Sequence, residues 1–177
     1  MKTNSHIYSQ YLIQKSELKT FEKINSFEVM QKAAKASFDY IIKNIQYQKI
    51  LIICGPGNNG GDGLLIAKYF NDRKSNVVIF APLQLGKTKD SKKALETLQN
   101  NSLIKANINF EKYDLIIDCL FGVGFNRPFS QELYSLINTI NKANTKIISI
   151  DIPSGIYTDI GAISSIAVKA NITLTFH

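Results

Sequence analysis

The chain has 177 residues, of which 45% are hydrophobic and 20% are charged, and its formal net charge is +7. This length favours a single domain over residues 1–177, and the apolar content excludes a disordered chain. No stretch reaches the roughly 18–20 apolar residues that a membrane-spanning helix needs. Residues 1–14 lack the apolar run of a secretory signal. The positive charge is spread singly along the chain, which we interpret as a solvated surface and not as a nucleic-acid site.

Cysteine and histidine are scarce, and this limits the chemistry that the chain can perform. Cys54 and Cys119 each end an apolar, strand-like run. We therefore expect two buried, reduced thiols and a cytoplasmic protein. The two histidines, His6 and His177, lie near the ends of the chain. Their positions argue against a Ser-His-Asp triad and against a histidine-ligated zinc site.

The first part of the chain, over about residues 9–44, predicts helices. In its second half apolar side chains recur every three or four residues, and Ser26 is the expected N-cap of that helix. Beyond it, over about residues 49–177, strand-like and helix-like segments alternate. We expect strands at 49–54, 76–81, 114–119, 146–150 and 171–176, with a short extra strand near 107–110. We expect helices at about 61–72, 90–100 and 130–142.

The predicted strands are continuous apolar runs, without the alternation of a half-exposed strand. Parallel strands that are covered on both faces have this pattern. The alternation of strands and helices then predicts an α/β fold, with a doubly wound, mostly parallel sheet and helices on both faces. In such a sheet, ligands bind beyond the carboxyl ends of the strands.

Three loops that follow predicted strands have unusual sequences: GPGNNGGDG at 55–63, DCLFGVGFNRP at 118–128, and DIPSG at 151–155. Each contains glycine and one carboxylate, and Arg127 adds a positive fork that suits phosphate. A strand, a glycine-rich turn and a helix start form an anion site, because the first N–H groups of a helix are unpaired. The three loops therefore predict a site for a phosphorylated ligand. Its carboxylates are not needed to hold phosphate, so at least one is expected to do chemistry or to hold a cation.

Two looser motif matches carry less weight. Residues 55–60 fit GxGxxG, but a conventional NAD site also needs an acid near the end of the second strand. That strand ends in Phe80-Ala81-Pro82-Leu83, so we do not expect a standard dinucleotide dehydrogenase. Residues 81–88 fit a relaxed P-loop, but the match contains one glycine, and we interpret it as chance.

The three loop sequences, in this order, resemble those of the YjeF N-terminal domain family, whose enzymes are NAD(P)H-hydrate epimerases. The resemblance covers residues from about 10 to 177. It implies a Rossmann-like fold and, commonly, a homodimer. It also implies interconversion of the R and S forms of hydrated NADH and NADPH (NADHX and NADPHX), a repair step that is linked to a separate dehydratase.

The resemblance also implies which residues form the site. The substrate-binding residues would be Asn58, Asn59, Gly60, Gly61, Asp62, Gly122, Val123, Gly124, Phe125, Asn126, Arg127, Pro128 and Asp151. Val123 stands where the family often has threonine, so one hydroxyl contact is missing. A potassium ion is implied between Asn59, Asp118 and Ser154, whose hard oxygen donors suit an alkali cation.

Inverting the hydrated ring carbon requires a group that gives and takes a proton. Because the chain has almost no histidine, we predict that Asp151 is this acid/base. Structural roles stay open for each carboxylate: Asp151 as a cap of the following turn, Asp62 as a helix-start cap, and Asp118 as a loop organiser in place of a cation ligand.

A second hypothesis is a non-catalytic dimeric module that binds nucleotide or RNA. The same domain type occurs in eukaryotic scaffold proteins of mRNA decapping, and a nucleotide sensor without turnover is a third hypothesis. The chain retains Asn59, Asp118, Asp151 and Ser154 together. A scaffold needs none of these four side chains, so their presence favours the enzyme.

Overall fold

The computed structural model describes residues 15–16, 24–98, 101–157 and 161–176. Within these residues, six strands form one sheet in the order β3-β2-β1-β4-β5-β6, and every pair of neighbours is parallel. The strands are β1 (Lys49–Cys54), β2 (Asn76–Phe80), β3 (Ile104–Lys105), β4 (Leu115–Cys119), β5 (Lys146–Ile150) and β6 (Ile172–Leu174). The sheet confirms the predicted doubly wound α/β fold.

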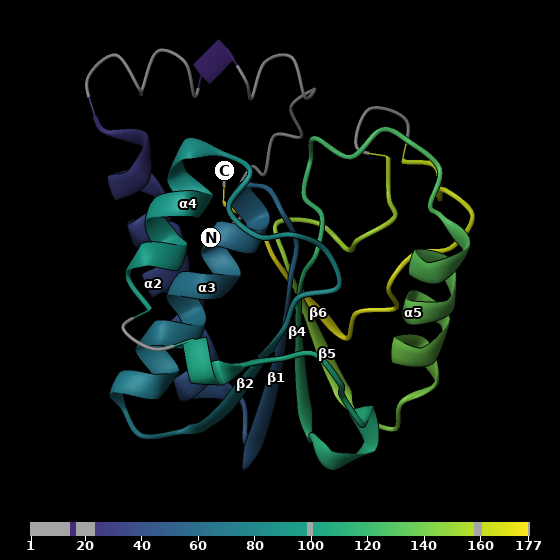
Figure 1. Cartoon of the computed structure of the whole chain (residues 1–177), viewed down its shortest axis with the longest axis horizontal. Coiled ribbons are helices and arrows are strands. Elements are labelled where there is room, and N and C mark those ends of the chain that lie inside the picture. Colours follow the sequence, from purple (N-terminus) through teal and green to yellow (C-terminus); the bar gives the residue numbers. More distant parts are fainter. Residues whose placement is uncertain (1–14, 17–23, 99–100, 158–160, 177) are drawn as a thin grey trace, which may run out of the picture.

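Helices cover both faces of this sheet, as predicted. Figure 1 shows α2 (Ser26–Asn44), α3 (Asn58–Asp72) and α4 (Lys89–Glu96) on one side and α5 (Gln131–Lys142) on the other. Two short 3-10 helices, η1 (Asn101–Leu103) and η2 (Phe110–Lys112), lie in the connection from α4 to β4. None of the helices in the described part of the chain is long and apolar enough to cross a membrane.

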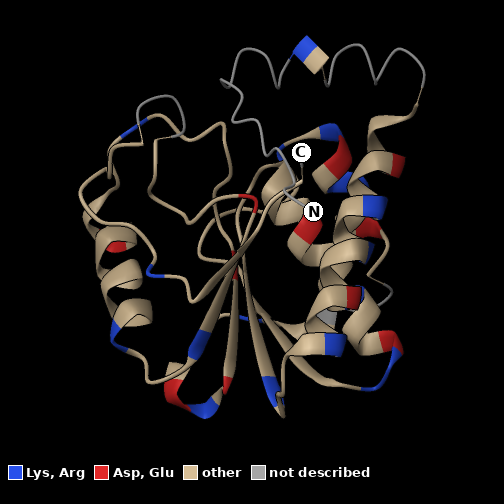
Figure 2. Ribbon diagram, turned by 180° about the vertical axis from the view of Figure 1, so that it is seen from behind, with Lys and Arg blue, Asp and Glu red and all other residues tan. Residues whose placement is uncertain are grey.

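Strand β1 lies between β2 and β4, and this central position explains why its residues 50–54 are all apolar. Ile50, Ile52 and Cys54 pack in the core beneath α2, α3 and α4. Leu51 and Ile53 pack in the second core, on the α5 side. Successive residues of a strand point to opposite faces of the sheet, and helices cover both faces here. All five side chains are therefore fully buried. Charged residues lie mainly on the helices and at the ends of the strands (Figure 2).

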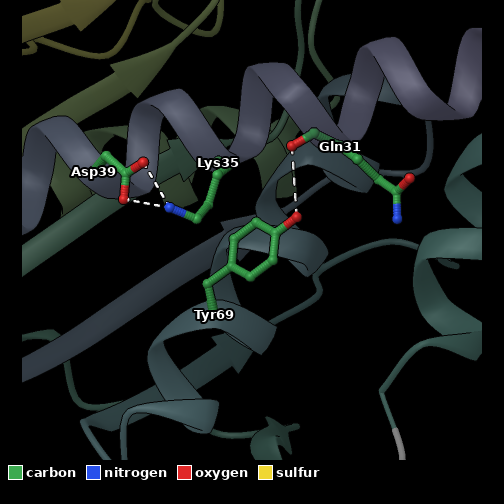
Figure 3. Close-up of polar contacts among 4 residues, drawn as sticks. All are labelled: Gln31, Lys35, Asp39 and Tyr69. Carbon is green, nitrogen blue, oxygen red and sulfur yellow. Dashed lines mark hydrogen bonds and ion pairs between the residues drawn. The ribbon is translucent and has the colours of Figure 1, made fainter.

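Helix α2 packs across α3 through aromatic side chains. The ring of Phe38 lies 5.6 Å from that of Tyr69 and 4.9 Å from that of Phe70, measured between centroids. The Tyr69 hydroxyl is 3.5 Å from the carbonyl oxygen of Gln31, and Lys35 pairs with Asp39 at 2.6 Å on the exposed side of α2 (Figure 3). Helix α2 thus covers α3, which begins within the glycine-rich sequence 55–63.

Several predicted boundaries were wrong. The N-cap of α2 is Asn25 and not Ser26, because the Asn25 side chain accepts a hydrogen bond from the N–H of Phe27 at 2.9 Å. Helix α4 begins at Lys89 with Thr88 as its cap and ends at Glu96. Of the segment predicted as helical before α2, the structure describes residues 15–16, which are helical, and residues 24–25, which are not.

Two further corrections concern loops. Helix α3 begins at Asn58, three residues before the predicted start, with Gly57 as its N-cap. The short extra strand is β3 at Ile104–Lys105, which pairs with β2. The region predicted for it, 107–110, runs instead into η2, where the Asn109 side chain accepts from the N–H of Glu111 at 3.1 Å. Asparagine favours this kind of local turn over a strand.

Candidate functional site

A cavity of about 650 Å³ lies at the carboxyl ends of the strands and is lined by residues from all three predicted loops. Its predicted lining residues are Asn58, Asn59, Asp62, Gly122, Val123, Gly124, Phe125, Asn126, Arg127 and Asp151. Gly60, Gly61 and Pro128 were also predicted to contact the ligand, but they do not line the cavity. Its volume falls within the roughly 300–1,000 Å³ of ligand pockets.

The first turn of α3 places the asparagines of the glycine-rich loop at the cavity. Asn58 and Asn59 are the first two residues of the helix, and the Gly57 cap supplies no side-chain hydrogen bond. Gly60 is required for packing, because a Cβ there would lie 1.8 Å from the carbonyl oxygen of Gly55. The helix therefore starts tightly against the end of β1, with the partial positive charge of its N-terminus at the cavity.

Asp151 has a backbone conformation that is unusual for a residue with a side chain. Its φ is 69°, in the left-handed region, and its N–H donates to the carbonyl oxygen of Leu174 at 2.7 Å. Its carboxylate accepts a hydrogen bond from the N–H of Val123 at 3.0 Å. A Cβ on Gly122 would lie 2.4 Å from the same carboxylate oxygen. Strained backbone of this kind, costing about 1–3 kcal/mol, clusters at functional sites.

Asp62 is the second carboxyl group of the cavity. It is the fifth residue of α3, so it does not cap the helix start, which was the structural alternative left open for it. Burial raises the pKa of Asp62 well above its usual range, and the negative charge of Asp151 raises it further. Asp62 therefore keeps its proton to a higher pH than an isolated carboxyl group does.

Asp118 organises the loops beneath the cavity. Its carboxylate is 1% exposed and accepts hydrogen bonds from the Ser154 hydroxyl at 2.6 Å, the Ser154 N–H at 2.9 Å, the Ser149 hydroxyl at 2.8 Å and the Leu120 N–H at 3.2 Å. Burial raises the pKa of Asp118, and these hydrogen bonds oppose the rise. The contacts support the interpretation of Asp118 as a loop organiser that joins the ends of β4 and β5.

Asn59 differs from the other two predicted cation ligands. It is 7% exposed, and among the described residues neither its amide oxygen nor its amide nitrogen has a hydrogen-bond partner. A Cβ on Gly122 would lie 3.2 Å from the Asn59 Cβ, so this amide sits against the second loop. Buried amides are rarely left unsatisfied, and a ligand or an ion explains such a group. Oxygen donors of Asn59, Asp118 and Ser154 fit a hard cation.

An aromatic stack supports the second loop. The rings of Phe121 and Phe125 lie 4.7 Å apart, and Phe125 stacks on Phe129 at 4.6 Å and on Tyr157 at 5.8 Å. Phe121 and Phe125 also line the cavity. The stack therefore gives the site an apolar wall.

The two thiols lie beside the site but outside its chemistry. Cys54 and Cys119 are free and buried, as predicted, and they face each other in the register of β1 and β4. Burial raises the pKa of both thiols. Gly63 packs directly on them, since a Cβ there would lie 2.7 Å from the Cys119 Cβ and 2.8 Å from the Cys54 sulfur.

Sequence reasoning missed the side of the cavity formed by α2, the start of α4 and the C-terminal residues described. The missed lining residues include Ser26, Val29, Met30, Thr88, Asp90 and Phe176. Val29 and Met30 belong to helix α2, and Phe176 follows β6. Thr88 could have been found, because Thr88 and Ser91 have the spacing of a capping box, which the structure forms.

Comparison with known proteins bears on the same residues. The model of the family described as YjeF-related protein N-terminus matches residues 26–177. An NAD(P)H-hydrate epimerase of Limosilactobacillus fermentum is 34% identical over 166 residues, covering 86% of this chain and 76% of the relative. A bifunctional NAD(P)H-hydrate repair enzyme Nnr of Dictyoglomus turgidum is 36% identical over 156 residues, covering 83% of this chain. The chain spans 30% of that bifunctional relative's length.

The crystal structure of the yeast protein ynu0 has the same fold, with a TM-score of 0.80 at 22% sequence identity. The superposition covers 96% of this chain and 79% of the yeast chain. The family model matches well over half of the chain and includes all three loops of the cavity. The chain therefore belongs to the family of YjeF-related protein N-terminal domains.

Proposed function

We propose that the chain is an NAD(P)H-hydrate epimerase that interconverts the R and S forms of NADHX and NADPHX. One observation carries the proposal: the cavity holds two interacting carboxyl groups, Asp62 and Asp151, of which Asp62 has a strongly raised pKa. The name of the Limosilactobacillus relative, which matches most of this chain, supports the same reaction.

The carboxyl pair can supply the proton that the reaction needs. The hydrated ring carbon carries a hydroxyl group next to the ring nitrogen. The proton held by Asp62 and Asp151 leaves with this hydroxyl group as water, and the ring nitrogen stabilises the cation that remains. Water then adds to the opposite face of the ring and returns a proton to the pair. In this scheme Asp151 is the acid/base and Asp62 shares its proton.

The rest of the cavity binds the non-reacting parts of the nucleotide. The diphosphate lies at the N-terminus of α3, where Asn58 and Asn59 begin the helix, and Arg127 from the second loop adds positive charge. Phe121 and Phe125 supply apolar surface beside it. These contacts hold the substrate while its ring carbon is inverted.

A potassium ion is part of the proposal. Asn59, Asp118 and Ser154 would hold it, and the unsatisfied amide oxygen of Asn59 supports this assignment. When bound, the ion supplies positive charge beneath the loops that carry the substrate. Because four protein hydrogen bonds already reach Asp118, the chain's own contribution there is to fix Ser154 and the end of β4.

A cytoplasmic homodimer and a separate dehydratase complete the proposal. Buried free thiols suit a reducing compartment. The bifunctional repair enzymes that match this chain are much longer than it, which supports a link between this domain and a second repair activity. Light scattering on the purified chain tests the dimer directly.

The test is an epimerisation assay. Purified R-NADHX is incubated with the chain in potassium buffer, and the R and S forms are separated by chromatography. We expect equilibration faster than the spontaneous rate, lost in Asp151→Asn and kept in Asp39→Asn, whose carboxylate pairs with Lys35 on the exposed side of α2. Nucleotide binding without acceleration would point to a sensor, and no nucleotide binding would point to a scaffold.

A further inference from the structure

Asp90 is a buried carboxylate in the cavity that the proposed reaction does not use. It is the second residue of α4, is 8% exposed, and lines the cavity. Among the described residues, its Oδ1 has no hydrogen-bond partner. Burying an unpaired carboxylate oxygen costs free energy, so a partner for it is expected in the working protein.

The start of α4 is fixed against the glycine-rich loop. The hydroxyl of Thr88, the N-cap, donates to the Asn58 side-chain oxygen at 2.5 Å. The Ser91 hydroxyl and the Lys87 N–H both donate to the carbonyl oxygen of Pro56, at 3.2 Å and 3.0 Å. Asp90, between Thr88 and Ser91, is therefore held in place whether or not a ligand is bound.

Asp90 and Asp151 reach the cavity from connections that follow different strands. Asp90 belongs to the connection after β2, and Asp151 follows β5, with β1 and β4 between these strands in the sheet. Three strand spacings of ~4.8 Å separate β2 from β5 by about 14 Å. The cavity that both residues line also includes Pro56 and Gly57 after β1 and Phe121 and Gly122 after β4, and its volume of about 650 Å³ suits an extended ligand such as a dinucleotide.

Positive charge is scarce in the cavity. Arg127, on the loop after β4, is the only basic residue among the described residues that line the cavity. A carboxylate accepts hydrogen bonds and donates none, so Asp90 suits a ligand group with O–H or N–H donors. A phosphate at Asp90 would meet a like charge with no described cationic lining residue on that side.

We propose that Asp90 accepts hydrogen bonds from the ribose hydroxyls of the adenosine half of the substrate, and that the site therefore prefers NADHX to NADPHX. This inference rests on the proposed function. In dinucleotide-binding folds, an acid at the end of the second strand binds the ribose 2′-hydroxyl. Here β2 ends at Phe80 without an acid, and α4 brings Asp90 into the cavity ten residues later.

The test measures binding of two unreactive fragments, ADP-ribose and 2′-phospho-ADP-ribose, by titration calorimetry. We expect the wild-type chain to bind ADP-ribose at least about tenfold more tightly, because the 2′-phosphate replaces a donor by a like charge. Asp90→Asn should reduce this ratio towards one, since it removes the charge and keeps an acceptor. Asp90→Ala should also weaken ADP-ribose binding by about tenfold or more.

Glu96→Gln, an exposed acid in the last turn of α4, is the matched control and should leave the ratio unchanged. Thermal unfolding checks the fold: losing an unpaired buried carboxylate should not lower the melting temperature in Asp90→Asn. Equal binding of the two fragments by the wild-type chain, or a ratio unchanged in both Asp90 variants, would overturn the inference. Because neither fragment can be epimerised, a chain without turnover that still shows the ratio contradicts only the proposed reaction.

Discussion

The two edges of the sheet use the same kinds of polar residues for different purposes. At the amino edge, the Asp114 carboxylate accepts hydrogen bonds from the N–H groups of Gln48 and Lys49 at 2.8–3.1 Å, and the Asn171 side chain accepts from the N–H of Ile147 at 2.7 Å. At the carboxyl edge, Asn59 and Asp90 carry atoms without partners among the described residues.

The comparison separates residues that stabilise the fold from residues that the fold positions for a ligand. Asp114 joins β4 to the start of β1, and both of its carboxylate oxygens accept backbone hydrogen bonds. Asp62 has a raised pKa, and Asp151 has a left-handed backbone. Such costs are expected where a protein positions groups for a ligand, since a structural role alone would select satisfied and relaxed groups.

The largest effect is expected from Gly122→Ala, which tests whether the carboxyl edge of the sheet positions Asp151 for the reaction. The new Cβ would lie 2.4 Å from the Asp151 carboxylate, so that side chain or the loop must move. We expect at least about a hundredfold loss of epimerisation, because small misplacements of catalytic groups have effects of this size. Gly124→Ala is the matched control, since a Cβ there meets no atom within 4 Å. Equal rates in the two variants would contradict the placement of Asp151.

Asp114→Ala tests whether polar residues at the amino edge of the sheet serve stability and not the reaction. It removes the acceptor for two exposed backbone N–H groups at the start of β1, and a hydrogen bond of this kind contributes about 0.5–1.5 kcal/mol to stability. Urea unfolding should show this loss of stability, while the epimerisation rate of the folded fraction stays close to that of the wild type. A variant with full stability and a low rate would reverse the roles that we assign to the two edges.

Asp62→Asn should change how stability depends on pH. Because the pKa of Asp62 is raised in the folded state, the native chain keeps a proton that the unfolded chain releases above its ordinary pKa near 3.8. The free energy of unfolding therefore falls as pH rises from there towards the folded-state pKa. The variant lacks this slope, so its stability relative to the wild type should increase with pH in urea titrations between pH 4 and 8. If the stability difference between the variant and the wild type stayed constant over this pH range, the pKa of Asp62 would not be raised in the folded chain.

The smallest effect is expected at the thiols. Burial raises the pKa of Cys54 and Cys119, so neither should react with a thiol reagent at pH 8 in the folded chain. Both should react once the chain is unfolded in denaturant, as a colorimetric thiol count would show. Fast reaction of a folded thiol would mean that the carboxyl ends of β1 and β4 open readily.

Much of the fold followed from the sequence because its signals are local. Continuous apolar runs predicted β1, β2, β4, β5 and β6 to within a few residues, and Ser130 caps α5 directly before its first residue. Glycine is a poor helix former, so the early start of α3 was not predicted. Its first turn is stabilised by contacts with the end of β1 that no local pattern reports.

The sequence predicted the part of the site that lies in the three loops with recognisable motifs. The three loops identified Asp62, Asp118 and Asp151, and strand order explains why they converge. Asp90 was missed because the search for an acid stopped at the end of β2. Its position depends on the hydrogen bonds that fix α4 against the glycine-rich loop, and the sequence shows these contacts only after the fold is known.

The account depends most directly on the acid/base role of Asp151, and one comparison of rates tests it. Asp151→Asn and Asp114→Asn remove one carboxylate from each edge of the sheet, and each would be assayed with R-NADHX at matched nucleotide occupancy. We predict that Asp151→Asn loses at least about a hundredfold in epimerisation while its nucleotide affinity is largely kept, and that Asp114→Asn stays within a few fold of the wild type. Wild-type turnover in Asp151→Asn would contradict the account.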